Sequence, residues 1–131
     1  TPPDPDLECE YSARFDLARA ADSHEAAGEF AAALRGLADE IDLLKSRWKS
    51  GDLDDGAIEE QLADIDNRLL KIALKHLPGQ DRTKLEKSVD RKLKPHFEAM
   101  SENDRERTRS AALNSKVRQH FRLPKITLFS L

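Results

Sequence analysis

The sequence predicts an all-α fold: a helical bundle built on a long antiparallel helical hairpin, with shorter flanking helices and an extended C-terminal tail. Apolar residues recur at steps of three and four through most of the 131 residues, as they do along one face of a helix. Aromatic residues make only 5 % of the chain, which disfavours a β-sandwich. The length suits one domain.

The two longest apolar series predict the hairpin. The first runs from Phe30 to Trp48, and the second runs from Ile58 to Ile72 and reaches His76. Two long helices joined by a short turn form an antiparallel pair. The helix ends are marked by an Asp22/Glu25 pair at capping-box spacing, by Gly51, and by Pro78-Gly79.

Shorter helices are expected on both sides of the hairpin. Before it, the predicted apolar face consists of Leu7, Tyr11, Phe15 and Ala18. After it, a helix carries Leu85, Val89 and Leu93, and Pro95 should kink that helix or end it at Lys94. A last helix is expected to begin at Ser101, paired with Asp104, to bury Leu113, Val117 and Phe121, and to end at Pro124.

These elements divide the chain into a linker over 1–6, a helical domain over 7–123 and an extended tail over 124–131. The chain begins with Thr1 in an acidic, proline-rich stretch, so we expect a C-terminal domain cut from a larger intracellular protein. A single Cys9 suits a reducing compartment, and no apolar run has the length of a membrane helix. The expected location is cytoplasmic, with no membrane contact.

Charge is distributed unevenly along the chain. Residues 1–66 hold 6 basic and 18 acidic side chains, whereas residues 67–131 hold 16 basic and 7 acidic ones. Clustered Lys and Arg on helix faces are typical of phosphate binding. The candidate nucleic-acid-binding residues are Lys84, Lys87, Arg91, Lys94, Arg105, Arg109 and Lys116. The alternative is that the acidic and basic halves neutralise each other, consistent with a net charge of −3.

The tail carries the sequence Lys125-Ile126-Thr127-Leu128-Phe129. It resembles the sliding-clamp-binding peptide of bacterial replication and repair proteins, Gln-Leu-x-Leu-Phe, with Lys125 in place of the Gln. The resemblance covers five residues and implies an accessory factor whose anchors, Ile126, Leu128 and Phe129, enter a pocket on the clamp. The alternatives are a tail that folds back over the core, or one that adds a strand to a partner sheet. Trp48 is a further candidate anchor, or else a plug at the rim of the core.

No motif points to catalysis or to a metal. The four histidines lack the spacing of metal ligands, and Glu60 and Asp64 share a helix face without the Glu-x-x-His pattern of di-iron bundles. No P-loop or dinucleotide-binding glycine motif occurs. We expect no catalytic residue, no metal site and no cofactor.

The sequence therefore predicts a non-catalytic helical module that binds a protein partner, with DNA replication, repair or mobility as the context that the tail suggests. One alternative is a nucleic-acid-binding domain that does not read sequence, using the basic half. Another is a helical subdomain attached to an enzyme outside this chain. The apolar stripe could also be buried between two copies, so a homodimer stays open.

Overall fold

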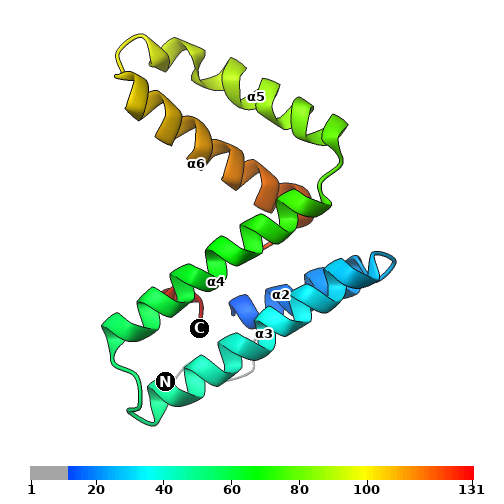
Figure 1. Ribbon diagram of the computed structural model, residues 1–131, viewed down its shortest axis with the longest axis vertical. Helices are drawn as coiled ribbons and strands as arrows, with labels where there is room; N and C mark the ends of the chain where they lie inside the picture. Colours follow the sequence, from blue (N-terminus) through cyan, green and yellow to red (C-terminus); the bar gives the residue numbers. More distant parts are fainter. Residues whose placement is uncertain (1–11) are drawn as a thin grey trace, which may run out of the picture.

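The computed structural model describes residues 12–131, and the chain is helical through most of that range (Figure 1). The all-α class and the helical bundle are confirmed. In chain order the elements are α2 (Ala13–Ser23), α3 (Gly28–Lys49), α4 (Asp55–His76), α5 (Gly79–Phe97), α6 (Glu102–Phe121) and a 3-10 turn, η1 (Leu128–Ser130). No strand occurs among the described residues.

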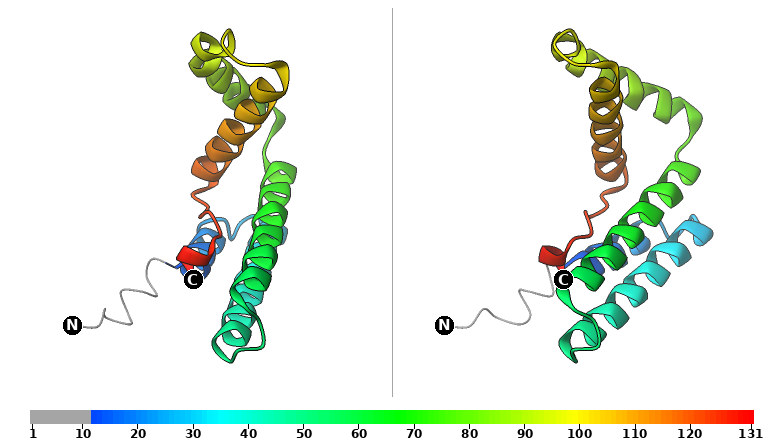
Figure 2. Two further views of the ribbon diagram at one scale, coloured as in Figure 1. Left: turned by 90° about the vertical axis from the view of Figure 1, so that its left-hand side faces the viewer. Right: turned by 60° about the vertical axis from the view of Figure 1, so that its left-hand side comes forward.

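Two helix pairs meet at α4. Helix α2 packs along α3, α3 contacts α4, and α5 packs on α6, which in turn contacts α4. Figures 1 and 2 show α5 and α6 as an arm that extends from the end of α4, away from α2 and α3. The packing of α2 on α3 is more extensive than that of α3 on α4. That the pair formed by α3 and α4 is the frame of the bundle therefore stays a prediction.

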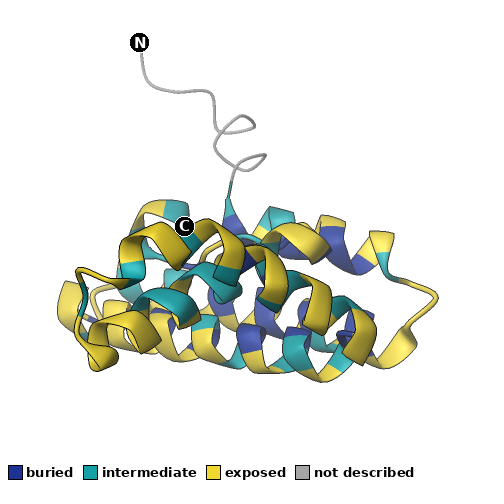
Figure 3. Cartoon of the chain, turned by 90° about the horizontal axis from the view of Figure 1, so that it is seen from above, coloured by how far each residue is buried: buried dark blue, intermediate teal, exposed yellow. Residues whose placement is uncertain are grey.

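The core lies between α2, α3 and α4, and the end of α6 and the tail close it. Its largest fully buried side chains are apolar, and none of the buried residues in 12–131 is polar or charged. The arm has much less core: Val89 is the one buried residue of α5, and α6 buries Val117 and Phe121 near its end. Most of the arm is accordingly exposed or intermediate in Figure 3. The arm therefore has less apolar packing than the core to stabilise its helices.

The start of α3 differs from the prediction. Asp22 lies in the last turn of α2, and α3 begins at Gly28 after Ala27, whose side chain makes no capping hydrogen bond. The Asp22/Glu25 capping box is therefore wrong. Asp22 instead accepts a hydrogen bond from Arg35 of α3. The far end of α3 agrees with the sequence, because Gly51 has a φ of +86° and turns the chain toward α4.

Helix α5 continues through Pro95 to Phe97, so it does not end at Lys94. Pro95 cannot donate a hydrogen bond to the Arg91 carbonyl one turn before it, and α5 ends two residues later. The start of α6 is as predicted, since the Ser101 hydroxyl accepts a hydrogen bond from the Asp104 amide at 3.2 Å. That helix ends at Phe121, before Pro124, because Arg122 adopts a left-handed conformation with a φ of 56°.

The tail folds back over the core instead of running out extended. After 124–127 it forms the turn η1, closed by hydrogen bonds between Thr127 and Ser130. Leu123 and Ile126 are buried in the core, and Leu128 packs against it. Of the predicted first helix, Phe15 and Ala18 lie in α2. The linker over 1–6, Leu7, Cys9 and Tyr11 lie outside the described residues.

Candidate nucleic-acid interface

One side of α5 carries four exposed cations: Lys84, Lys87, Arg91 and Lys94. We call these four residues the basic face. Their spacing of three, four and three keeps them on one side of the helix, while Leu85, Val89 and Leu93 are partly or fully buried on another. At a rise of 1.5 Å per residue the basic face is about 15 Å long.

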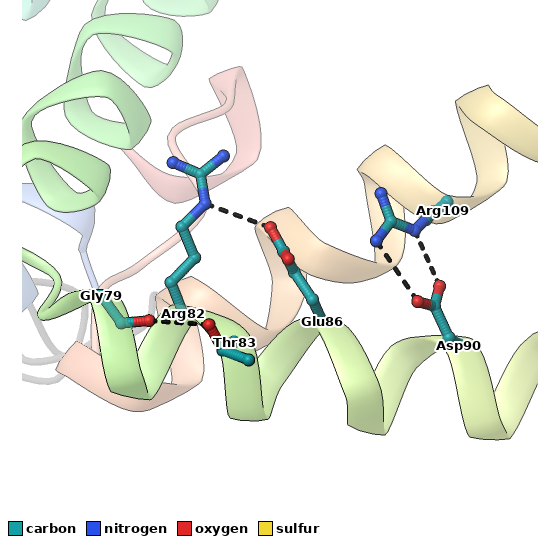
Figure 4. Close-up of polar contacts among 6 residues, drawn as sticks. All are labelled: Gly79, Arg82, Thr83, Glu86, Asp90 and Arg109. Carbon is teal, nitrogen blue, oxygen red and sulfur yellow. Dashed lines mark hydrogen bonds and ion pairs between the residues drawn. The ribbon is translucent and has the colours of Figure 1, made fainter.

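The carboxylates within α5 pair with other cations. Asp90 accepts two hydrogen bonds from Arg109 of α6, at 2.7 and 3.3 Å, and Glu86 accepts one from Arg82 at 3.2 Å (Figure 4). Asp81 lies 3.9 Å from the ring of His120. Over residues 12–131 no ion pair involves any member of the basic face. These four cations therefore keep their full charge toward solvent.

The three candidates on α6 are placed differently from those on α5. Arg109 is held by Asp90, and this hydrogen bond lowers the pKa of the Asp90 carboxyl and raises the pKa of the Arg109 guanidinium. Arg105 is exposed, and its Nε donates to the Met100 carbonyl at 3.2 Å. Lys116 is half-buried. The structure thus brings four of the seven predicted residues together and gives Arg109 a role in joining the two helices.

Neutralisation between the acidic and basic halves occurs, but at other places. Arg118 of α6 lies 2.6 Å from Asp66 of α4, and both side chains are mostly buried, at 15 % and 14 % exposed. At the surface, Arg68 pairs with Glu40 and Lys75 with Glu29, two contacts between α4 and α3. The neutralisation alternative is thus correct for cations of α4 and for Arg118, and it does not extend to the basic face.

The candidate partner-binding residues are divided between core and surface. Ile126 is 3 % exposed, and its amide donates to Asp66 Oδ1 at 3.1 Å. Leu128 is half-buried, whereas the Phe129 side chain is fully exposed. Trp48 is half-buried and its indole donates to Asp55 Oδ1 at 2.8 Å, which links the end of α3 to the start of α4. Phe129 is the one of these four that projects freely.

Spacing along the sequence did not reveal the contacts that hold the helix ends together. The ring of His24 packs against Phe30 and Phe121, and Phe30 stacks on His76 with centroids 5.0 Å apart. His24 Nε2 also lies 3.2 Å from the Phe121 carbonyl. A cluster assembled from four separate segments leaves no local pattern.

Two further findings bear on function. Within residues 12–131 no three His, Cys, Asp or Glu side chains are grouped so that they could hold a metal ion. No helix in this range is both long enough and apolar enough to span a bilayer. The sequence matches no protein-family model, and no curated protein or solved structure is significantly similar to the chain.

Proposed function

We propose that this protein is a non-catalytic helical interaction module that binds the phosphate backbone of nucleic acid through the basic face of α5. The observation that carries the proposal is the charge pattern of this helix. Four exposed cations follow one side with no acidic partner in the described chain, while Glu86 and Asp90 pair with Arg82 and Arg109 and Asp81 lies beside the ring of His120. A row of this kind is complementary to a row of phosphates.

The binding should depend strongly on salt and weakly on sequence. Lysine and arginine on a phosphate backbone release condensed counterions, so affinity falls with salt in proportion to the number of phosphates neutralised. Four contacts imply a loss of about 50- to 150-fold between 50 and 200 mM salt, for single strands and duplex respectively. The basic face consists of Lys and Arg alone, and their charge attracts a phosphate whichever base it carries.

The test is a fluorescence-anisotropy titration with labelled single-stranded and duplex DNA and RNA at both salt concentrations. Reversing all four charges (Lys84→Glu, Lys87→Glu, Arg91→Glu, Lys94→Glu) should abolish binding. A matched control reverses four exposed cations elsewhere: Arg47→Glu, Lys49→Glu, Lys71→Glu and Lys125→Glu. Equal losses in the two variants would show that only net charge matters. A dissociation constant above about 100 µM at low salt would also reject the proposal.

Phe129 supports a second candidate, a protein contact at the tail. A fully exposed phenylalanine, on a turn fastened through Ile126 and Leu128, is a pre-formed anchor for an apolar pocket. Engagement of a sliding clamp by all three anchors would require Ile126 and Leu128 to leave the core. Calorimetry with a purified bacterial sliding clamp tests this candidate. Binding should be nearly independent of salt and lost in the Leu128→Ala/Phe129→Ala double variant, whereas no binding by the unaltered protein rejects it.

A further inference from the structure

The outer end of the arm, where α5 ends and α6 begins, contains a hollow of about 280 Å³. It is lined by Phe97 from α5 and by Glu102, Asn103, Arg105, Glu106 and Arg109 from α6. In Figure 1 this end of the arm lies far from α2 and α3. The volume is just below the range of typical small-molecule sites, so the hollow suits one ring system.

The lining favours a flat, uncharged group. Phe97 is half-buried and does not belong to the core, and it contributes the apolar part of the lining, which is where a flat ring could stack. The Arg105 guanidinium offers a second planar surface against which a base could stack. A phosphate is disfavoured here, because Glu102 and Glu106 are acidic and Arg109 is already paired with Asp90.

The hollow lies less than one helical turn beyond the end of the basic face. Lys94 precedes Phe97 by three residues, which is about 4.5 Å along the helix axis. A strand whose phosphates follow the basic face from Lys84 to Lys94 therefore arrives at Phe97. A base can enter only if it is neither paired nor stacked within a duplex.

We infer that the ligand is single-stranded nucleic acid, with one unpaired base held in this hollow against Phe97. This inference rests on the proposed function, because the basic face positions the strand. Stacking on an aromatic ring does not depend on which base is present, so the protein should distinguish single strands from duplexes without reading sequence.

The experiment compares dissociation constants for a labelled 20-nucleotide single strand and for the duplex of the same sequence. Phe97→Ala should weaken single-strand binding by about 5- to 150-fold and leave duplex binding unchanged. Phe129→Ala is the matched control: the same substitution at an exposed site on the tail should change neither constant. Phe97→Tyr should retain the preference for single strands. Phe97→Leu, which keeps an apolar side chain but cannot stack, should lose it.

Several outcomes overturn the inference. If Phe97→Ala weakens both ligands equally while Phe97→Leu restores both, Phe97 serves the fold of the arm. If Phe97→Ala changes neither constant, the hollow holds no base, yet the proposed function survives as long as reversing the basic face still abolishes binding. If the unaltered protein binds neither ligand, the proposed function itself fails.

Discussion

Asp66 joins three segments with two oxygen atoms. Its Oδ2 accepts a hydrogen bond from the Arg118 guanidinium of α6 at 2.6 Å, and its Oδ1 accepts one from the Ile126 amide of the tail at 3.1 Å. Both charged side chains lie largely out of solvent. Replacing only one member of such a pair is destabilising, because the other member is then desolvated and unpaired.

Asp66→Ala should therefore lower the free energy of unfolding by about 2–4 kcal/mol, since it leaves the Arg118 charge and the Ile126 amide without their acceptor. Urea denaturation followed by circular dichroism measures this loss. Asp64→Ala is the control on the same helix: Asp64 is 69 % exposed and pairs with Arg68, so its loss should cost under about 1 kcal/mol. Similar values for the two variants would contradict the role given to Asp66.

Residues that cap a helix or lie on its apolar face are easier to predict from the sequence than residues that join one helix to another. Ser101 and Gly51 were predicted correctly because their signals are local. Asp66 stood among several acids on one helix, and nothing marked it, since its partners lie 52 and 60 residues away. The Asp22/Glu25 pair had the correct spacing, but α2 continues to Ser23 and takes Asp22 into its own last turn.

At the scale of elements, the Asp90–Arg109 pair fastens α5 to α6 where the arm has little apolar core. The hydrogen bond from Arg109 lowers the pKa of Asp90 in the folded state. The pair thus adds stability that is complete above the ordinary carboxyl pKa, near 4, and is lost as the pH falls through the lowered value.

Asp90→Asn should be less stable than the unaltered protein at pH 7, and the difference in melting temperature should shrink as the pH falls below about 4. Thermal melts of α-helical circular dichroism between pH 2.5 and 7 would show this convergence. Glu98→Gln is a control at the end of the same helix, where the carboxylate is exposed and forms no ion pair in the described range. A constant difference for Asp90→Asn across the whole pH range would exclude the pair as its cause.

Element boundaries followed from the sequence wherever apolar spacing and helix breakers agreed. The ends of α4 and the start of α6 are examples. Of the two effects predicted for Pro95, the helix end at Lys94 is wrong, because α5 continues to Phe97. In the tail, the predicted extended backbone holds at Thr127 and fails at Leu128–Ser130, where the chain turns, and the burial of Ile126 agrees with the fold-back alternative. The conformation of the tail therefore follows from the burial of Ile126 more than from local backbone preference.

On the scale of the whole molecule, two bodies of unequal stability share α4. One contains α2, α3 and most of the buried apolar side chains, and the other is the arm. Helix α5 packs mainly on α6, so the arm can open while α2 and α3 stay folded. The basic face thus lies on the less stable of the two bodies.

Hydrogen exchange read by mass spectrometry should show α5 amides exchanging well before those of α3. Val89→Ala should speed exchange in α5 and α6 alone, because it removes the buried side chain of α5. Leu34→Ala, at a fully buried position of α3, should speed exchange everywhere by lowering global stability. Uniform protection across the chain, or an equal response to both substitutions, would mean that the molecule unfolds as one unit.

The uneven charge of the two halves of the chain predicts part of the ion pairing in the molecule. The contrast between residues 1–66 and 67–131 correctly indicated cross-neutralisation, as at Arg118 and Asp66. It could not say which cations would be left over, because that depends on which helix faces meet. The basic face stays unpaired because α5 packs on α6, itself in the basic half, while the acidic residues of α4 lie between Asp55 and Asp66, toward the end away from α5.

The aromatic cluster around Phe30 has a consequence for the order of folding events. His24 and Phe121 are 97 residues apart in the chain, so their contact closes a loop that spans most of the protein. Closing so large a loop has a high entropic cost before any contact compensates for it, and such contacts form late. Shortening the Phe121 side chain should then hardly change the folding rate and should mainly increase the unfolding rate. We therefore expect the cluster to close after the helices have formed locally.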